Sequence, residues 1–243
     1  MSALYQAKST QICRWHSFSN LASLENTATQ TILESAHHAI QQRGAFHLVL
    51  AGGNTPRQIY KKLREADADW HRWHIYFGDE RCLPAHHPER NSLMASETWL
   101  DHVAIPRLQI HAIPAELGAD IGAQHYAKIM SSIKLFDLVL LGLGEDGHTA
   151  SLFPGHELGH HAQSPAVLAV FDAPKAPAAR VSLSANRLSA TRQVLFLAAG
   201  KNKAAATQHW REGINLPAAA IQPENGVDIF LENFSESVAK ESK

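Results

Sequence analysis

Short apolar runs alternate with amphipathic stretches along this chain, a pattern typical of a β-sheet covered by helices. The strongest strand pattern, at residues 136–144, is apolar at consecutive rather than alternate positions. A strand of this kind is buried on both faces, so we expect it at the centre of a parallel sheet. Further strands are expected at residues 11–15, 46–51, 74–79, 108–113, 166–171, 180–184, 193–199 and 227–231.

Helices are expected between these strands, at residues 21–43, 91–101, 119–133 and 201–211, and from Pro56 onward. Gly44 follows the first helix, where a left-handed residue commonly ends a helix. No repeat, low-complexity tract or long linker divides the chain. The pattern therefore predicts a single α/β domain over residues 1–243, with a mostly parallel, Rossmann-like central sheet flanked by helices.

Composition narrows the class of protein. The 243 residues carry 22 Lys and Arg against 23 Asp and Glu, a formal net charge of −1. This balance disfavours binding to nucleic acid or to an anionic membrane surface. No apolar run reaches the roughly 18 residues of a membrane span. Two cysteines, Cys13 and Cys82, and an N-terminus without the apolar core of a secretory signal predict a cytoplasmic protein.

Three unusual stretches follow predicted strands, at the sheet edge where parallel α/β proteins bind ligands. In the first, Gly52 and Gly53 end one strand and precede the helix at Pro56. Paired glycines let the backbone approach an anion, and the helix offers unpaired N–H groups and the positive end of its dipole. Residues 52–55 are therefore a candidate phosphate cradle. A tight turn without a ligand explains the same residues equally well.

The second stretch places Asp79, Glu80 and Arg81 at the end of an apolar strand. Three charged side chains are costly to desolvate there unless they pair with one another or meet a charged ligand. A binding role is one interpretation. The other is a solvated turn with one Asp–Arg ion pair, and composition alone favours it.

The third stretch, residues 142–155, brings a histidine into a glycine-rich loop beyond the predicted central strand. The glycines indicate a bent backbone that places Asp146 and His148 over the sheet edge. Histidine suits general-base catalysis because its ordinary pKa lies near neutrality. The alternative is a surface histidine in a flexible loop.

Two motifs in this region are misleading. Gly142, Gly144 and Gly147 fit GxGxxG, but a dinucleotide site needs a full helix after the third glycine, and residues 154–155 are Pro-Gly. Residues 156–160 fit HExxH, but zinc binding needs both histidines on one face of a stable helix, and Gly159 lies inside this stretch. We expect a loop here, with neither a dinucleotide nor a catalytic metal.

The segments 50–56, 79–84 with Asn91, and 142–155 resemble, in order and spacing, the signatures of the 6-phosphogluconolactonase family. That family belongs to a wider group with glucosamine-6-phosphate deaminases and ribose-5-phosphate isomerases, and the likeness runs along nearly the full chain. Deaminases carry a glutamate a few residues after the histidine, in an Asn-Glu-Pro context, where this chain has Leu152-Phe153-Pro154. Ala51, Asn54 and Arg90 stand where serines are usual, so no side-chain role is carried over at these positions.

The resemblance implies hydrolysis of 6-phospho-D-glucono-1,5-lactone to 6-phospho-D-gluconate, with no metal or other cofactor. His148 would be the general base and Asp146 would orient it. Arg81 would stabilise the oxyanion, while Asp79 would hold Arg81 or a sugar hydroxyl. The phosphate would rest on the backbone of Gly52, Gly53, Asn54 and Thr55, clamped by Arg180 and Lys203.

Two other functions stay open on the sequence alone. One is a glucosamine-6-phosphate deaminase or another sugar-phosphate isomerase, which the absence of the glutamate a few residues after His148 disfavours. The other is a non-catalytic sugar-phosphate sensor, which would have no use for Asp146 and His148. The expected partner is a small sugar-phosphate lactone rather than nucleic acid or membrane, and the assembly is expected to be a monomer or a small homo-oligomer.

Overall fold

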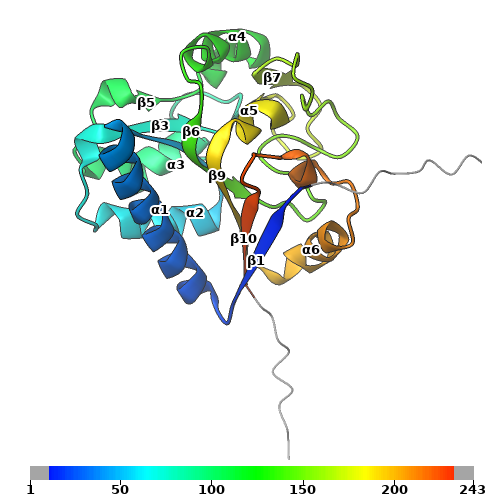
Figure 1. Ribbon diagram of the computed structural model, residues 1–243. Helices are drawn as coiled ribbons and strands as arrows, with labels where there is room; N and C mark the ends of the chain where they lie inside the picture. The colour runs from blue at the N-terminus through cyan, green and yellow to red at the C-terminus, as the bar shows by residue number, and fades with distance from the viewer. Residues whose placement is uncertain (1–10, 233–243) are drawn as a thin grey trace, which may run out of the picture.

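A twisted sheet runs through the centre of the computed structural model, which describes residues 11–232 (Figure 1). Within that range the sheet has seven strands in the order β1-β10-β9-β6-β2-β3-β5, and every pairing is parallel. The mostly parallel α/β architecture predicted from the sequence is confirmed. The strands are β1 Cys13–Phe18, β2 Phe46–Leu50, β3 Trp73–Phe77, β5 Ile110–His111, β6 Phe136–Gly142, β9 Thr191–Ala198 and β10 Val227–Glu232.

Strand β6 occupies the middle of the sheet, as its apolar sequence predicted. All its residues from Phe136 to Leu141 are buried. Leu138 and Val139 pair with β2 on one side and with β9 on the other. Because parallel strands all point the same way, the loops that follow β2, β6 and β9 emerge at one edge of the sheet.

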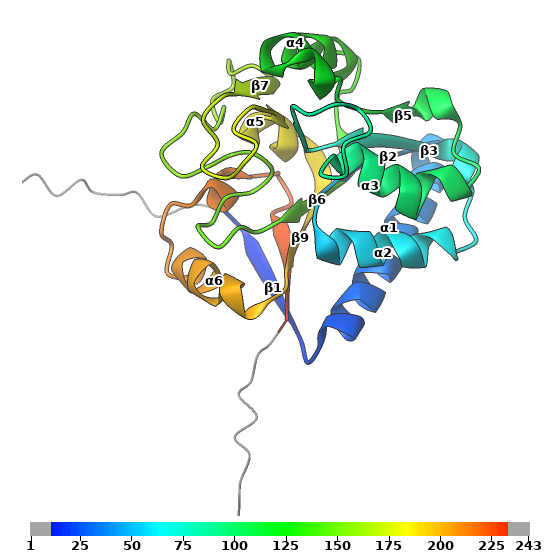
Figure 2. The same ribbon diagram turned by 180° about the vertical axis from the view of Figure 1, so that it is seen from behind.

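Helices cover both faces of the sheet. Helix α1 begins after Asn20, whose side chain accepts a hydrogen bond from the Ser23 amide, and ends at Gly44 with φ 79°. It packs against β1, β2, β6 and β10, and α2 lies between α1 and α3 (Figure 2). The helices are α1 Leu21–Arg43, α2 Asn54–Arg64, α3 Asn91–Thr98, α4 Ala119–Met130, α5 Ala185–Ser189 and α6 Ala204–Arg211.

A second, smaller sheet was not predicted. It contains β4 (Asp79–Arg81), β8 (Arg180–Leu183) and β7 (Val167–Val170), and both of its pairings are antiparallel. The sequence pattern reads residues 74–79 as one strand, but Gly78 separates β3 from β4. Its N–H donates to Leu50 O at 3.0 Å and its carbonyl accepts from Leu183 N at 2.8 Å, so Gly78 joins the two sheets.

Other differences from the expected elements are local. The predicted helix 91–101 divides into α3 and a 3-10 turn at Leu100–His102, and the predicted helix 201–211 starts with a 3-10 turn at Lys201–Lys203. Helix α5 was missed. Residues 156–160 form no helix, in agreement with the prediction of a loop. Within residues 11–232, no helix is long and apolar enough to cross a membrane. The prediction of a single domain over residues 1–243 stays a prediction, and residues 1–10 and 233–243 lie outside the described residues.

Candidate active site

A cavity of about 530 Å³ opens at the carboxyl ends of β2, β6 and β9. Leu50, Leu141 and Leu197, at the ends of these strands, form part of its floor. The small sheet contributes a wall through Asp79, Arg81 and Arg180, so the cavity lies where the two sheets meet. Nine of the predicted site residues line it: Gly52, Gly53, Asn54, Thr55, Asp79, Arg81, His148, Arg180 and Lys203.

The turn from β2 into α2 forms one side of the cavity. A Cβ at Gly52 would collide with the Asn91 side chain amide, so only glycine allows this close approach. Gly53 precedes α2 with φ 103° and provides no side-chain cap. The first amide groups of α2 are therefore free of a capping side chain, and the positive end of the helix dipole faces the cavity. This is the geometry of an anion site.

Strand β4 divides its charged side chains between two environments. Asp79 and Arg81 line the cavity, whereas Glu80 between them is completely buried. The Asp79 carboxylate accepts from Ser151 Oγ at 2.6 Å and from Asn91 Nδ2 at 3.2 Å. The expectation gave Asp79 either Arg81 or a sugar hydroxyl as partner. Among the described residues Asp79 and Arg81 form no ion pair, since the carboxylate is held by Ser151 and Asn91, and the contact with a sugar hydroxyl stays a prediction.

Arg81 is anchored elsewhere, through Nη1, which donates to Glu89 O at 2.6 Å. Asp79 interacts electrostatically with Arg180, which lies on the neighbouring strand β8. Burial lowers the pKa of the Arg180 guanidinium, and the negative charge of Asp79 offsets part of that shift. Both arginines remain available to an anion in the cavity.

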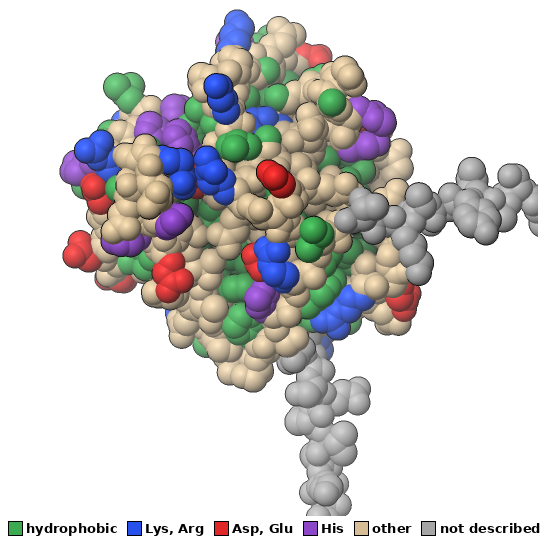
Figure 3. All heavy atoms as spheres, in the orientation of Figure 1, with side chains coloured by type: hydrophobic (Ala, Val, Ile, Leu, Met, Phe, Trp, Pro, Cys, Tyr) green, Lys and Arg blue, Asp and Glu red, His purple; other side chains and the backbone are tan. Residues whose placement is uncertain are grey.

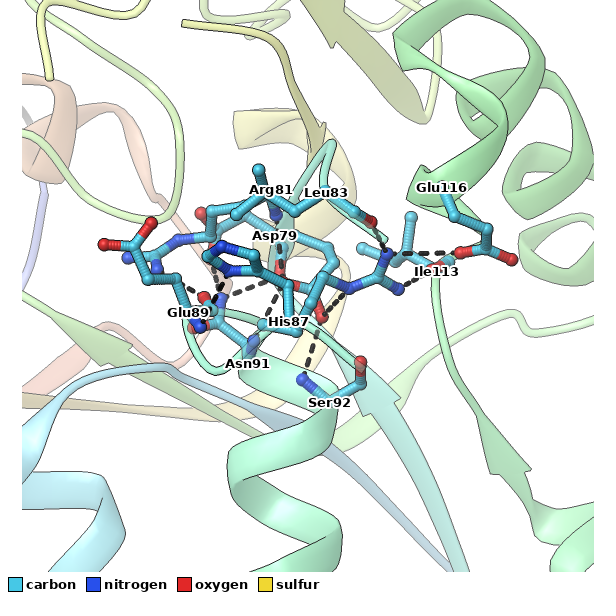
Figure 4. A network of polar contacts seen from close by, with 11 residues as sticks. Asp79, Arg81, Leu83, His87, Glu89, Asn91, Ser92, Ile113 and Glu116 are labelled. Carbon is cyan, nitrogen blue, oxygen red and sulfur yellow. Dashed lines mark hydrogen bonds and ion pairs between the residues drawn. The ribbon is translucent and has the colours of Figure 1, made fainter. Parts of the chain in front are cut away.

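A buried network holds β4 against the start of α3 (Figure 4). The Glu80 carboxylate accepts from the backbone amides of Arg81 at 2.9 Å and of Asn91 and Ser92, both at 2.8 Å. It thereby caps the amino end of α3, as a carboxylate does favourably. Arg90 Nε lies 3.1 Å from Glu80 Oε2, and only 3% of the Arg90 side chain is exposed.

The Arg90 guanidinium also ties this network to two further segments. It donates to Leu83 O and Ile113 O, each at 2.9 Å, and to Glu116 Oε2 at 3.1 Å. Sequence reasoning gave Arg90 no role and left Glu80 in a solvated turn. The sequence signal that could have indicated the buried pair is the run of three charged residues after an apolar strand, because buried charged side chains must pair.

The loop after β6 presents the imidazole of His148 to the cavity. His148 Nδ1 lies 2.5 Å from Asp146 Oδ1, which also accepts from the His148 amide at 3.1 Å. Burial raises the pKa of Asp146, but the hydrogen bonds from His148 outweigh it and the net shift is downward. A Cβ at Gly144 would collide with the imidazole. Ala150, further along the loop, has φ 49°, a strained conformation for a residue other than glycine.

Asp146 itself does not line the cavity and contacts the Nδ1 side of the His148 ring. Because Nδ1 faces this carboxylate, Nε2 is the nitrogen left for a ligand. The ring packs against Phe153, with 4.9 Å between the ring centres. The arrangement holds an imidazole in one orientation at the mouth of a cationic cavity, which is what a general base requires.

Cationic side chains from two late segments complete the cavity. Burial lowers the pKa of Lys203, the nearby positive charge of Lys175 adds to that effect, and Glu145 and Asp146 oppose it. Arg180 donates to the carbonyl oxygens of Lys175 at 2.8 Å and Pro177 at 3.0 Å, which fixes this loop beside the cavity. Lys175 was not among the predicted residues, because it lies in a proline-rich loop with no regular pattern.

Comparison with known proteins identifies the family of this chain. Residues 19–230 match the family model of the glucosamine-6-phosphate isomerases/6-phosphogluconolactonase. The chain belongs to this family. A 6-phosphogluconolactonase from Nostoc sp. is 34% identical over 206 residues, which cover 79% of this chain and 84% of that protein.

Family members occur both alone and within longer chains. The GDH/6PGL endoplasmic bifunctional protein of Oryctolagus cuniculus is 35% identical over 207 residues, which cover 79% of this chain but only 26% of that protein. Among solved structures, a 6-phosphogluconolactonase from Thermotoga maritima superposes with a TM-score of 0.84 at 26% identity. That superposition covers 91% of this chain and 100% of the other, so the family fold is present in full.

Proposed function

We propose that this chain hydrolyses 6-phospho-D-glucono-1,5-lactone to 6-phospho-D-gluconate. The observation that carries the proposal is a histidine oriented by a carboxylate at 2.5 Å, at the mouth of a cavity that also holds a glycine turn and several cations. The names of the relatives, lactonases aligned over most of this chain, support the same activity.

In the proposed complex the phosphate rests on the backbone amides of residues 52–55, at the amino end of α2. Lys203 and Arg180 neutralise its charge, and Lys175 is a third cation in the same cavity. Holding the substrate by its phosphate restricts the reacting carbonyl to one region of the cavity. Such positioning contributes to catalysis before any bond changes.

Hydrolysis then needs one base and one group for the developing negative charge. His148 Nε2 takes a proton from water, whose oxygen attacks the lactone carbonyl carbon. The carbonyl oxygen becomes an oxyanion, which Arg81 stabilises. As the intermediate collapses, the bond from the carbonyl carbon to the ring oxygen breaks, and the imidazolium returns its proton to that oxygen. Asp146 stabilises the imidazolium between the two steps.

Neither alternative function accounts for the loop after β6. Where deaminases carry Asn-Glu-Pro this chain has Leu152-Phe153-Pro154, so the position of the glutamate holds Phe153, an apolar side chain that is 1% exposed and packs against the His148 ring. A sugar-phosphate sensor would not need an oriented imidazole. The reaction as proposed uses the chain's own side chains, and residues 11–232 contain no group of three or more ligand side chains that could hold a metal ion.

The location proposed with this activity is the cytoplasm, and the partner is the small-molecule substrate. Cys13 and Cys82 are free thiols, as a reducing compartment maintains them. Analytical ultracentrifugation would show which of the two expected assemblies, a monomer or a small homo-oligomer, the protein forms.

A pH-controlled lactonase assay on His148→Ala tests the proposal. Loss of the base is expected to lower kcat by about 10²- to 10³-fold with the melting temperature unchanged. The matched control is His156→Ala, which removes another loop histidine that pairs with a carboxylate, Asp172, at 3.4 Å. Wild-type turnover in the His148 variant would overturn the assignment. Ammonia release from glucosamine 6-phosphate by the wild type would favour the deaminase instead.

A further inference from the structure

A second cavity, which we call the amino-edge cavity, lies at the opposite edge of the main sheet. It has a volume of about 310 Å³ and opens at the amino ends of β2, β6 and β9. Lys, Arg and His side chains gather on this face of the molecule, over the region of β3, β6 and β9 (Figure 3). The lining residues are Arg43, Ala45, His47, residues 132–135, Asp137 and Arg192.

Asp137 organises the amino-edge cavity. Only 7% of its side chain is exposed, and Oδ1 accepts from Arg43 Nε at 3.1 Å and Nη2 at 2.8 Å. Oδ2 accepts from the His47 amide at 2.8 Å. Both carboxylate oxygens are therefore engaged by protein donors, and Arg43 is held at the cavity in one orientation.

The cavity carries more positive charge than the protein neutralises. Arg43, Lys134 and Arg192 line it together with one carboxylate. Among the described residues Lys134 has no ion-pair or hydrogen-bond partner, and Arg192 has only a 3.5 Å contact of its Nε with Asp137. The contacts of Asp137 with Arg43 and with the His47 amide are enough to connect α1, β2 and β6. Lys134 and Arg192 add cations that this structural role does not use.

We propose that the amino-edge cavity binds a small dianion of the phosphate-monoester class. Arg43 Nη1, which Asp137 does not engage, and the Arg192 guanidinium offer N–H donors to phosphate oxygens, and the Lys134 ammonium adds a point charge. The volume is at the lower end of the roughly 300–1,000 Å³ of ligand pockets, so a phosphate with few further atoms fits. The site is separate from the candidate active site at the carboxyl edge, and the inference does not depend on the proposed lactonase activity.

A titration with inorganic phosphate at constant ionic strength, monitored through the backbone amide chemical shifts in NMR spectra, tests this inference. Two groups of amides report independently: residues 43–47 and 132–137 for the amino-edge cavity, and residues 52–55 for the active site. In Lys134→Ala/Arg192→Ala the Kd for phosphate at the amino-edge cavity is expected to rise at least about 10-fold, while the Kd at residues 52–55 stays unchanged.

The matched control, Arg72→Ala/Lys128→Ala, removes the same charges from exposed positions outside both cavities. Lys134→Ala alone, which breaks no ion pair, serves if the double variant is unstable. Three results would each overturn the inference. The first is the absence of saturable chemical-shift changes at residues 43–47 and 132–137. The second is shift changes that persist unaltered in both cavity variants. The third is an equal loss of phosphate affinity in the control variant, which would mean a general ionic effect.

Discussion

The Arg90 guanidinium lies 3.1 Å from the Glu80 carboxylate, and the exposed fractions of the two side chains are 3% and 0%. Removing one member of a buried pair leaves the other charged, desolvated and without a counter-charge, which costs roughly 3–5 kcal/mol. Glu80 also caps α3 and lies between Asp79 and Arg81 in β4. The pair therefore affects both the stability of the protein and the shape of the candidate active site.

Arg90→Ser, which removes the guanidinium, is expected to lower the free energy of unfolding by about 3 kcal/mol and to raise KM. The double variant Glu80→Gln/Arg90→Met removes both charges of the pair and leaves neither one buried without a counter-charge, so it should be more stable than Arg90→Ser. Urea unfolding and steady-state kinetics measure the two effects. Arg14→Ala breaks an ion pair whose arginine is 45% exposed, and should cost less than about 1 kcal/mol. Equal stability of Arg90→Ser and wild type would contradict this account.

Asp146→Ala removes the acceptor that orients the His148 ring. We expect kcat to fall about 10²-fold while KM changes little, because the carboxylate contacts the Nδ1 side of the ring and does not line the cavity. Asp172→Ala is the control, since it removes another His–Asp ion pair, that of His156, at a carboxylate that is 83% exposed. Equal kcat for the two variants would show that the Asp146 contact has no part in catalysis.

Lys203→Ala should act on substrate binding rather than on the chemical step. Losing a charge-assisted contact to the phosphate is expected to raise KM by about 10-fold or more, with kcat within a few-fold of wild type. Lys201→Ala removes a lysine of the same 3-10 turn that does not line the cavity. A KM for Lys203→Ala that matches the control would remove this residue from the proposed phosphate site.

Gly52→Ala tests the close packing of the β2–α2 turn against Asn91. The added methyl group must displace the Asn91 side chain, which holds Asp79 in place. We expect a loss of about 1–3 kcal/mol in stability together with a higher KM. Gly142→Ala is the control for stability, because a Cβ there meets no atom within 4 Å and φ is not left-handed. Thermal melting of both variants compares the two positions, and a Gly52→Ala protein as stable as the control would contradict the packing argument.

Three histidines on neighbouring strands form a stack at the edge of the main sheet. The ring centres of His47 and His74 are 4.7 Å apart, and those of His74 and His111 are 6.1 Å apart. Burial lowers the pKa of all three, and the proximity of His74 adds to the shift of the two outer rings. The folded protein thus binds fewer protons here than the unfolded chain. The contribution of the three neutral imidazoles to the free energy of unfolding is fully present above about pH 6.5, the ordinary pKa of imidazole. This contribution is lost as the pH falls through the lower pKa values of the folded protein.

His74→Gln removes the middle ring of the stack. The melting temperature of this variant is expected to fall less than that of the wild type between pH 7 and pH 5, since one protonation and its repulsion of the other two rings are gone. His38→Gln, at an exposed position of α1, is the control. Identical pH dependence in the wild type and both variants would contradict a role for the stack.

The main sheet could be predicted because its signals are local. The apolar run of β6 and the bounds of α1, with Gly44 after it, depend on residues close in sequence. The small sheet could not be predicted. Strand β4 consists of three charged residues separated from β3 by Gly78 alone, and its partner β8 lies far along the chain. Pairing between distant segments leaves little trace in a periodic pattern.

The same distinction holds for the candidate site. Gly52 and His148 lie in motifs whose neighbours identify them, and the structure places both at one cavity. Glu80 and Arg90 depend on a contact between a strand and the start of a helix, so local sequence could not separate a buried pair from a solvated turn. Lys175 comes from an irregular loop, and only the fold brings it to the cavity.

Gly78 is hydrogen-bonded into both sheets, through its N–H on one side and its carbonyl on the other. The strand ends that form the cavity floor and the small sheet that forms its wall are thus joined at a single residue, with no linker between them. A movement of one sheet against the other at this junction would have to break one of these two hydrogen bonds, so we expect the walls of the cavity to keep their positions when a sugar phosphate binds. Discrimination between substrates then depends on fixed shape and charge, without induced fit between the two sheets.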